Sequence, residues 1–477
     1  MDFVPRDLEK YLNDEFISKN FSDSEKSTEQ SILVGLGKNS FSQIDIKENI
    51  SKTDNPKIKE LWVSLQLELK PLKRLRICHK ILDADKTNID VQRMIMDCYL
   101  DLDQVNEAKE FLDEFERIHG NIYQVLFSKA DYLRHIGKFE DSIPLYKEAL
   151  LKSPDNDKIL NNLALTYSHL ELYDEAIQSY EKQIELDEND FIALYNYGSL
   201  LYDKKSYNDA IIRYDKVISI IPEYAKAWNG KGKALEKLGN YQEAIKCYDK
   251  AIEYDNKYDL AYKNKGNTFS KLNQYEEAIK CYDKAIEIDP KYKLAYKNKG
   301  NTLSELKKYE EAIKCYDKAI EIDPKYKWAY KNKGNALSKL KKYEEAIKCF
   351  DKAIELAPND SNLYNNASWT LSLNKKFLLA KPYVEKALAL DDSKGFIWHT
   401  LGYIHMNLGD DDKALHVFNH ALSLNQNQPY SLRDKGKILF KMGLIEEARE
   451  LIIKSKELEP EDEELNEFIK NTKIIST

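Results

Sequence analysis

The chain has 477 residues, of which 32 % are charged and 16 are glycine, and its net charge is −8. Acidic and basic residues are interleaved without a long basic run, which argues against a nucleic-acid partner. No apolar stretch reaches the roughly 18 residues of a membrane span, so we expect no membrane partner and, by default, a cytoplasmic location. The first residues, MDFVPRDLEKYLNDEF, lack the apolar centre of a signal peptide.

The residues before position 89 divide into two parts. Residues 1–54 are rich in Ser, Lys, Asn, Asp and Glu and poor in large apolar side chains, so we expect a short helix at Arg6–Ile17 and a mobile remainder. Residues 55–88 carry an apolar pattern that includes Trp62, Leu65 and Leu72. We interpret this second part as a degenerate helical hairpin that caps the N-terminal end of the remaining chain.

From residue 89 onward, the sequence repeats with a period of 34 residues. A fixed period of this length is typical of stacked helical hairpins, none of which can bury its apolar face alone. The period is marked by Gly198, Gly232, Gly266, Gly300 and Gly334, by Ala210, Ala244, Ala278, Ala312 and Ala346, and by Pro290, Pro324 and Pro358. Eleven units in constant phase begin at Ile89, Tyr123, Asp157, Phe191, Ala225, Asp259, Lys293, Lys327, Ser361, Gly395 and Pro429.

The unit from Asp259 to Tyr292 shows how each repeat forms two helices. Apolar and small residues recur at three- and four-residue steps, which predicts a first helix over about residues 260–272 and a second over about residues 275–288. Gly266 and Ala278 are small because the two helices must approach closely there. Pro290 ends the second helix.

The corner between the two helices needs a residue that tolerates a positive φ. Glycine does so best and asparagine next, whereas lysine there costs about 1 kcal/mol. We predict this conformation at Gly137, Gly239, Gly409, Gly443, Asn273 and Asn374, and at Lys307 and Lys341 in the central repeats.

These units resemble the tetratricopeptide repeat (TPR) family, which carries an aromatic residue, Gly or Ala, Ala, a second aromatic residue, Ala and Pro at set places in 34. The resemblance covers residues 89–462 and implies an all-α fold, a right-handed superhelix (α-solenoid) of eleven helical hairpins. In residues 463–477, Leu465, Phe468 and Ile469 form one apolar stripe, which predicts a C-terminal capping helix and tail. The resemblance also implies that the first helices line a concave groove, into which the second, fifth, sixth and ninth residues of each unit point.

The sixth residue is asparagine in six of the seven units that begin between residues 157 and 361. An amide offers one acceptor and two donors, so a row of amides can hold both backbone groups of an extended peptide. The row is similar to the asparagine ladder in the TPR superhelix of the O-linked N-acetylglucosamine transferases. The alternative is that these amides form hydrogen bonds within the stack. The row consists of Asn162, Asn196, Asn264, Asn298, Asn332 and Asn366, with Gly230 at the gap.

Lysine at the fifth place and asparagine at the ninth are similar to part of the carboxylate clamp of TPR co-chaperones. Lys263, Asn267 and Asn298 match that part, but Trp328 and Asn332 stand where the clamp has further cations, so we do not expect a strict receptor for chaperone tails. Lysines in a groove favour an acidic segment or a terminal carboxylate, and the alternative is a solvated lysine face. The same places hold Lys297, Asn301, Lys331 and Asn335 in the next two units.

Towards the C-terminus, aromatic residues occupy the groove places. They predict a patch that anchors an apolar side chain, with Trp328 and Trp369 as the anchors; the alternative is local packing. The aromatic residues are Trp328, Trp369, Phe396, Tyr403 and Tyr430.

Nothing in the sequence indicates a catalytic, metal or cofactor site. It contains no G-x-S-x-G, no Gly-rich phosphate loop and no H-E-x-x-H. His416 and His420 have no third ligand, and we expect no metal there. The last four of the six cysteines are 34 residues apart, and we interpret them as reduced copies, because about 10 Å between equivalent places exceeds the reach of a disulfide. The cysteines are Cys78, Cys98, Cys247, Cys281, Cys315 and Cys349.

The sequence therefore predicts a cytoplasmic, non-catalytic TPR scaffold without a cofactor. Its partner would be an extended protein or peptide segment in the concave groove, acidic where it meets the lysines. One alternative is an assembly scaffold that acts through its ends or its convex face, including self-association. Another is the recognition subunit of a separately encoded transferase complex.

Overall fold

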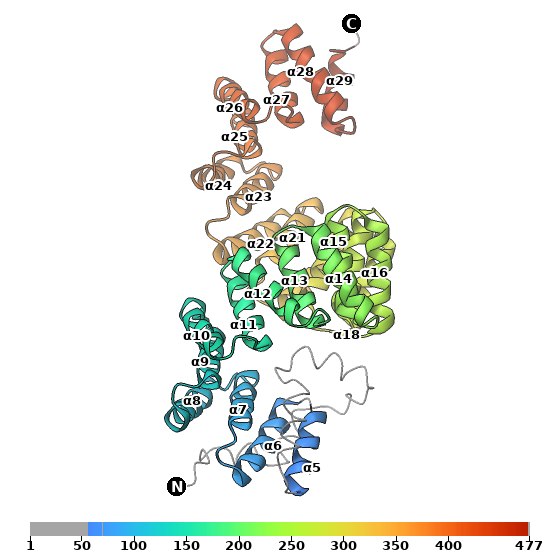
Figure 1. Ribbon diagram of the computed structural model, residues 1–477. Coiled ribbons are helices and arrows are strands. Elements are labelled where there is room, and N and C mark those ends of the chain that lie inside the picture. The colour runs from blue at the N-terminus through green and yellow to red at the C-terminus, as the bar shows by residue number, and fades with distance from the viewer. Residues whose placement is uncertain (1–55, 69, 476–477) are drawn as a thin grey trace. The chain divides into compact units, whose positions relative to one another are not determined.

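The computed structural model describes residues 56–68 and 70–475, and every regular element in these ranges is an α-helix (Figure 1). The prediction of an all-α solenoid is confirmed, because the helices follow one another in packed pairs. The expected helix at Arg6–Ile17 and the expected mobile stretch up to residue 54 lie outside the described residues.

Two helices precede the repeated pairs and one comes after them. The first helices of the pairs are α7 (Ile89–Asp101), α9 (Tyr123–His135), α11 (Asp157–His169), α13 (Phe191–Asp203), α15 (Ala225–Lys237), α17 (Asp259–Lys271), α19 (Lys293–Glu305), α21 (Lys327–Lys339), α23 (Ser361–Leu373), α25 (Gly395–Asn407) and α27 (Pro429–Lys441). The second helices are α8 (Val105–His119), α10 (Phe139–Lys152), α12 (Tyr173–Leu186), α14 (Tyr207–Ile220), α16 (Tyr241–Tyr254), α18 (Tyr275–Ile288), α20 (Tyr309–Ile322), α22 (Tyr343–Leu356), α24 (Phe377–Leu390), α26 (Asp411–Leu424) and α28 (Ile445–Leu458). The flanking helices are α5 (Pro56–Leu67), α6 (Pro71–Ala84) and α29 (Glu463–Thr472).

The chain forms two compact units, each made of several 34-residue repeats, with the boundary between Tyr254 and Asp255. We call them the first unit and the second unit. The first unit contains α5 to α16 and the second contains α17 to α29. The 34-residue period continues through the boundary, so periodicity does not indicate this division.

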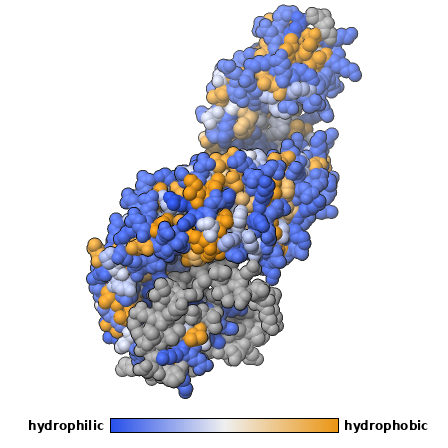
Figure 2. Space-filling view, turned by 45° about the vertical axis from the view of Figure 1, so that its right-hand side comes forward, coloured by the Kyte–Doolittle hydropathy of each residue, from blue (hydrophilic) through white to orange (hydrophobic). Residues whose placement is uncertain are grey.

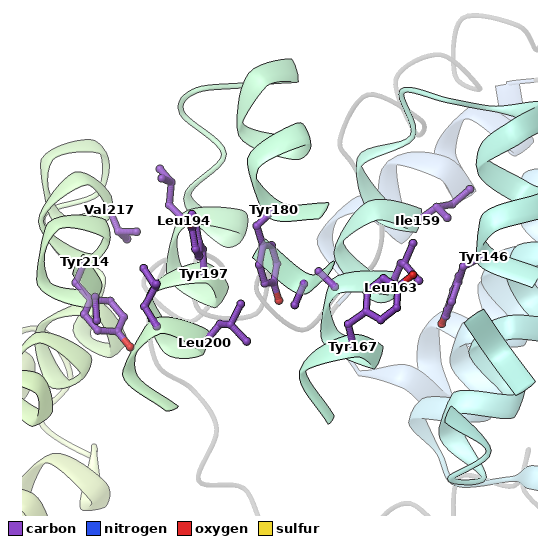
Figure 3. Packing of buried hydrophobic residues seen from close by; sticks show 14 of the residues in the cluster. Tyr146, Ile159, Leu163, Tyr167, Tyr180, Leu194, Tyr197, Leu200, Tyr214 and Val217 are labelled. Atoms are coloured by element: carbon purple, nitrogen blue, oxygen red, sulfur yellow. The ribbon is translucent and has the colours of Figure 1, made fainter. Parts of the chain in front are cut away.

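In the first unit, one tyrosine from each of several second helices is packed between successive helix pairs. Tyr146, Tyr180 and Tyr214 are at most 3 % exposed. They belong to one apolar cluster with Leu163 and Leu194, which come from the first helices of the following pairs (Figure 3). Each pair therefore buries its apolar face against the next pair, as a solenoid requires.

The glycine place of the repeat lies against the ring at this aromatic place. A Cβ added at Gly300 would be 2.6 Å from Cε1 of Tyr316, and one added at Gly266 would be 2.8 Å from Cε1 of Tyr282. Tyr316 is 1 % exposed and has little room to move away. Glycine recurs because the ring rests on the backbone of the first helix. This contact is the physical reason for the predicted close approach of the two helices.

The corner residues have the predicted conformation, with one correction. Gly239 and Lys307, for example, have φ values of +80° and +60°. The prediction for Asn374 is wrong, because its φ is −81° and the neighbouring Lys375 has φ +57°. The corner is the fifteenth residue of every unit, and Asn374 is the fourteenth. Its side chain instead donates to Glu344 Oε1 at 2.9 Å.

The two ends of the repeated array are covered by helices with one apolar side. At the N-terminal end, Trp62 and Leu65 of α5 and Cys78 of α6 are at most 1 % exposed and share a cluster with Val91 of α7. At the C-terminal end, Leu465 of α29 is fully buried in a cluster with residues of α27 and α28.

The side formed by the first helices is the inner side of each unit. In the second unit, α19 contacts the first helices on both sides of it, α17 and α21. Among the described residues, no two second helices of successive repeats are in comparably close contact. A stack whose first helices lie closer together must curve towards them, so this side is concave.

The exposed surface is mixed in polarity. On the face seen in Figure 2, apolar residues lie in short stretches between hydrophilic ones. None of the described helices is both long and apolar enough to cross a lipid bilayer.

Candidate peptide-binding groove

Asparagines of neighbouring first helices are hydrogen-bonded to one another on the inner side of the second unit. The sixth-place side chain donates through Nδ2 to the ninth-place Oδ1 of the preceding unit. We call the three resulting couples the amide pairs. They are Asn298–Asn267 at 2.7 Å, Asn332–Asn301 at 2.8 Å and Asn366–Asn335 at 3.3 Å. The structure therefore brings these six predicted residues together, and it shows the hydrogen bonding within the stack that was the alternative to peptide binding.

A tyrosine fixes the orientation of two of the amide pairs. Tyr282 Oη donates to Asn267 Oδ1 at 2.9 Å, and Tyr316 Oη donates to Asn301 Oδ1 at 3.0 Å. Burial raises the pKa of Tyr316 to about 12, so its phenol keeps the proton that it donates. Phe350 replaces this tyrosine in the next unit, where the Asn335 oxygen accepts only the longer bond among the described residues.

Each fixed amide pair leaves both kinds of hydrogen-bonding group available. In the Asn298–Asn267 pair, the Asn267 oxygen accepts two bonds, so its Nδ2 group points the other way. That Nδ2 group and the Asn298 oxygen have no hydrogen-bond partner within residues 56–68 and 70–475. The pair therefore keeps one donor group and one acceptor unused, which is the combination that a peptide backbone requires.

The fifth-place and seventh-place lysines of α19 and α21 differ in their charge partners. Lys299, at the seventh place, forms an ion pair with Asp283 of α18 at 2.5 Å. Lys297 and Lys331, at the fifth place, are half-buried and form no ion pair with any described residue. Desolvation lowers the pKa of Lys297. Lys331 places Nζ 5.3 Å from the ring centre of Trp328. The fifth-place lysines thus present uncompensated positive charge beside the amide pairs.

The α17 residues at the same places are engaged differently. Asn264 is only 6 % exposed, and both Asn264 and Lys263 interact with other groups in the molecule. We therefore place the open part of the groove on the amide pairs and on Lys297 and Lys331.

The asparagines of the first unit form a separate network. Asn162 Nδ2 donates to Asp131 Oδ1 at 2.7 Å, and Asn196 Nδ2 donates to Asn161 Oδ1 at 2.9 Å. Asp131 is 4 % exposed, and its burial raises its pKa despite the nearby charge of Arg93. Asp131 is the ninth residue of the repeat that begins at Tyr123, where the amide pairs of the second unit have asparagine. Its acceptors are already occupied, so this stretch offers less to a peptide.

The predicted aromatic anchors lie in two different environments. Trp328 is 44 % exposed, and its closest cations are Lys327 and Lys331. Trp369 belongs instead to a cluster with Tyr403, at 5.1 Å between ring centres, and with His399, at 5.7 Å. His399 was not predicted from the sequence, although it stands at the fifth place of its unit, where lysine stands two units earlier.

Charged residues behind this cluster hold the His399 ring in place. His399 Nε2 lies 3.1 Å from Asp434 Oδ2, and Arg433 Nε donates to Asp434 Oδ1 at 2.7 Å. Asp434 is fully buried, which alone would raise its pKa. The hydrogen bond from His399 and the charge of Arg433 outweigh burial and lower the pKa of Asp434 to about 2. The remaining predicted aromatic residues, Phe396 and Tyr430, are 45 % and 43 % exposed.

The cysteines and histidines outside the groove have structural surroundings. Burial raises the pKa of Cys247 and of Cys315 to about 11, so both thiols stay protonated at neutral pH. His420 packs against Trp398, at 4.4 Å between ring centres, and His416 is exposed on the same helix, α26. The part of the chain that the structure describes holds no group of three or more metal-ligating side chains.

The comparison with protein families identifies the repeats. Models of the tetratricopeptide repeat match residues 157–190, 225–258, 260–292, 294–326, 328–360, 349–381 and 395–428, and a TPR repeat model matches residues 198–239. Together the matched segments cover more than half of the chain. No curated protein matches the sequence.

Several solved structures are similar to this chain. The APC/C hetero-tetramer Cut9–Hcn1 is 13 % identical over 91 % of this chain and 99 % of that chain, with a TM-score of 0.45. A tetratricopeptide repeat protein from Parabacteroides merdae is 19 % identical over 52 % of this chain and 98 % of that chain, with a TM-score of 0.43. YrrB, described as a TPR protein with an unusual peptide-binding site, is 26 % identical over 41 % of this chain and 97 % of that chain, with a TM-score of 0.33.

Proposed function

Since the chain belongs to the tetratricopeptide repeat family, whose members bind protein partners, we propose that it is a non-catalytic scaffold for an extended, acidic protein segment. The segment would lie along α17, α19, α21 and α23 on the inner side of the second unit. The amide pairs would hold its backbone, Lys297 and Lys331 would select negative charge, and Trp328 would contact an apolar side chain.

The observation that carries this proposal is the fixed orientation of the amide pairs. Tyr282 and Tyr316 already hold the ninth-place oxygens, so the free donor and acceptor groups need little reordering when a ligand arrives. An extended backbone presents N–H and C=O groups that match them. An α-helical ligand has already used its backbone groups internally, so it would gain less from these amides.

The charge contrast between neighbouring lysines supports the acidic character of the segment. The whole chain has a net charge of −8, so it would not attract an acidic partner by its overall field. Lys299 is neutralised by Asp283, but Lys297 is desolvated without a carboxylate beside it. A carboxylate from the partner would supply the missing counter-charge through a charge-assisted hydrogen bond.

Affinity capture with a groove variant tests the proposal. The full chain and its Asn298→Ala/Asn332→Ala variant would be used to capture partners from the native host, and bound segments would be identified by mass spectrometry. The affinity of each recovered segment would then be measured by isothermal titration calorimetry. Two lost backbone contacts of about 1 kcal/mol each should weaken binding by roughly tenfold or more.

The matched control is Asn419→Ala/Asn471→Ala, which removes two exposed amides from α26 and α29. We expect this variant to bind like the unmodified chain. Unchanged affinity in a groove variant whose circular dichroism shows native helix content would contradict the proposal.

Assembly through the outer side is a second candidate, and one observation favours it. Leu378 and Leu379 of the second helix α24 are 76 % and 59 % exposed, which is unusual for neighbouring large apolar residues. Light scattering over a range of concentrations would detect self-association. If association occurs and Leu378→Ser/Leu379→Ser abolishes it while the groove variant has no effect on partner capture, the outer side is the working surface.

A further inference from the structure

We infer that the partner segment carries an acidic side chain at every third residue where it crosses α19 and α21. This inference rests on the proposed function and adds a spacing rule to it. The rule comes from the repetition of one set of groove groups in successive units. Each of these units contributes a fifth-place lysine and a ninth-place asparagine, namely Lys297 with Asn301 and Lys331 with Asn335.

The amide pairs set the distance between successive sets. A hydrogen bond of 2.7 Å joins Asn298 of α19 to Asn267 of α17, so two short side chains bridge neighbouring first helices. Helices in such contact lie about 10 Å apart. The lysines of successive units, which occupy equivalent places, should therefore repeat at about the same distance along the groove.

Three residues of an extended ligand cover this distance. A polyproline II segment rises about 3.1 Å per residue with three residues per turn, so residues three apart lie on one face about 9 Å apart. In a β-strand, residues three apart point to opposite faces, and residues two apart are only about 7 Å apart. A polyproline II segment also has no internal backbone hydrogen bonds, so its N–H and C=O groups are available to the amide pairs.

The charges along the groove require the acid to come from the partner. The second, fifth, sixth and ninth places of the units that begin at Asp259, Lys293 and Lys327 hold no aspartate or glutamate. The carboxylates that do approach these helices pair with lysines at other places. Lys299 and Lys333, at the seventh place, pair with Asp283 and Asp317. Lys293 and Lys327, at the first place, pair with Asp323 and Asp360. Lys297 and Lys331 therefore remain as the positive groups that a periodic acidic segment would meet.

A panel of synthetic peptides tests the spacing. The peptides would have equal length and composition and amidated C-termini, and the same number of acidic residues would be placed two, three or four positions apart. Binding to the full chain would be measured by fluorescence polarisation. We expect the every-third peptide to bind about tenfold more tightly than the other two, a difference of one matched charge contact.

Two variants locate the preference. Lys297→Gln/Lys331→Gln should abolish it, whereas Lys299→Gln/Lys333→Gln, which removes the same number of positive charges, should keep it. A copy of the every-third peptide with a free C-terminus should bind no better than the amidated copy. A gain of tenfold or more from the free terminus would identify a terminal carboxylate as the ligand and overturn the inference.

The remaining outcomes separate the inference from the proposed function. If all three spacings bind equally and Asn298→Ala/Asn332→Ala weakens each of them, the spacing rule is wrong and the proposed function stands. If the every-second or every-fourth peptide binds most tightly, the spacing rule is also wrong. If no peptide binds, or if the groove variants leave binding unchanged, the proposed function fails as well.

Discussion

The lysine corners of the second unit should be strained, and replacing them with glycine should stabilise the protein. Lys307 and Lys341 have φ values of +60° and +61°. Both side chains are exposed and form no ion pair with the described residues. A positive φ brings the Cβ of an L-residue close to a carbonyl oxygen, which costs about 1–2 kcal/mol.

The expected gain is this strain energy less the extra conformational entropy that glycine has in the unfolded chain. That entropy term is about 0.5–1 kcal/mol, which leaves a gain of roughly 0.5–1 kcal/mol at each corner. The corners are 34 residues apart and share no partner, so their effects should add. Lys307→Gly/Lys341→Gly should therefore raise the free energy of unfolding by about 1–2 kcal/mol.

Urea denaturation monitored by far-UV circular dichroism measures this change. Slower hydrogen exchange of amides in α19 to α22 should accompany it, because repeat arrays also unfold locally. The matched control is Lys308→Gly/Lys342→Gly, at neighbouring residues with φ −85°, where no strain exists to be relieved. If the control is stabilised as much as the corner variant, removal of charge explains the gain and the argument from backbone strain is refuted.

The packing supports three further predictions. Gly300→Ala should lower the free energy of unfolding by about 2–3 kcal/mol in thermal melts, because its Cβ would lie 2.6 Å from the Tyr316 ring; Tyr316→Leu in the same chain should recover part of the loss. Cys247 and Cys315 should react with a disulfide reagent at pH 8 roughly a hundredfold more slowly than an exposed cysteine, and faster as pH rises towards 11, because burial raises their pKa to about 11. Leu465→Ala should cost about 3 kcal/mol and speed hydrogen exchange in α28, because Leu465 is fully buried.

Each of these predictions has a clear contradictory result. Equal melting of Gly300→Ala and the unmodified chain would mean that the ring can move aside. Thiol rates like those of an exposed cysteine would mean that α16 and α20 open readily. Unchanged protection in α28 after Leu465→Ala would mean that α29 does not stabilise the end of the array.

The helices could be predicted from the sequence because the same residue types recur at the same places. Tyr275, Ala278 and Pro290 indicated the second helix of their unit, and α18 has the predicted bounds. The corner at Lys375 shows the limit of reasoning from residue type. Asparagine suits a positive φ better than lysine by about 1 kcal/mol. The register of the two helices is nevertheless fixed by many packed side chains, so the phase of the repeat puts the positive φ at Lys375 and not at Asn374.

From the sequence, the groove could be predicted only as a set of positions that recur in each repeat, without the contacts between them. The row of asparagines was evident, but the bond from Asn298 to Asn267 depends on how neighbouring helices are placed, which periodicity does not give. For the same reason, the sequence alone could not separate Lys297 from Lys299. The difference between them depends on Asp283, a residue of the preceding second helix.

Site-specific photo-crosslinking tests the central claim, that the inner side of the second unit is the working surface. A photoreactive amino acid would replace Leu294 on α19, which is exposed at a groove place, or Lys314 on α20, which is exposed on a second helix. Neither change touches an amide pair, Lys297 or Lys331. We expect a captured partner segment to crosslink at Leu294 and not at Lys314. Crosslinking at Lys314 alone would place the partner on the outer side and contradict the account.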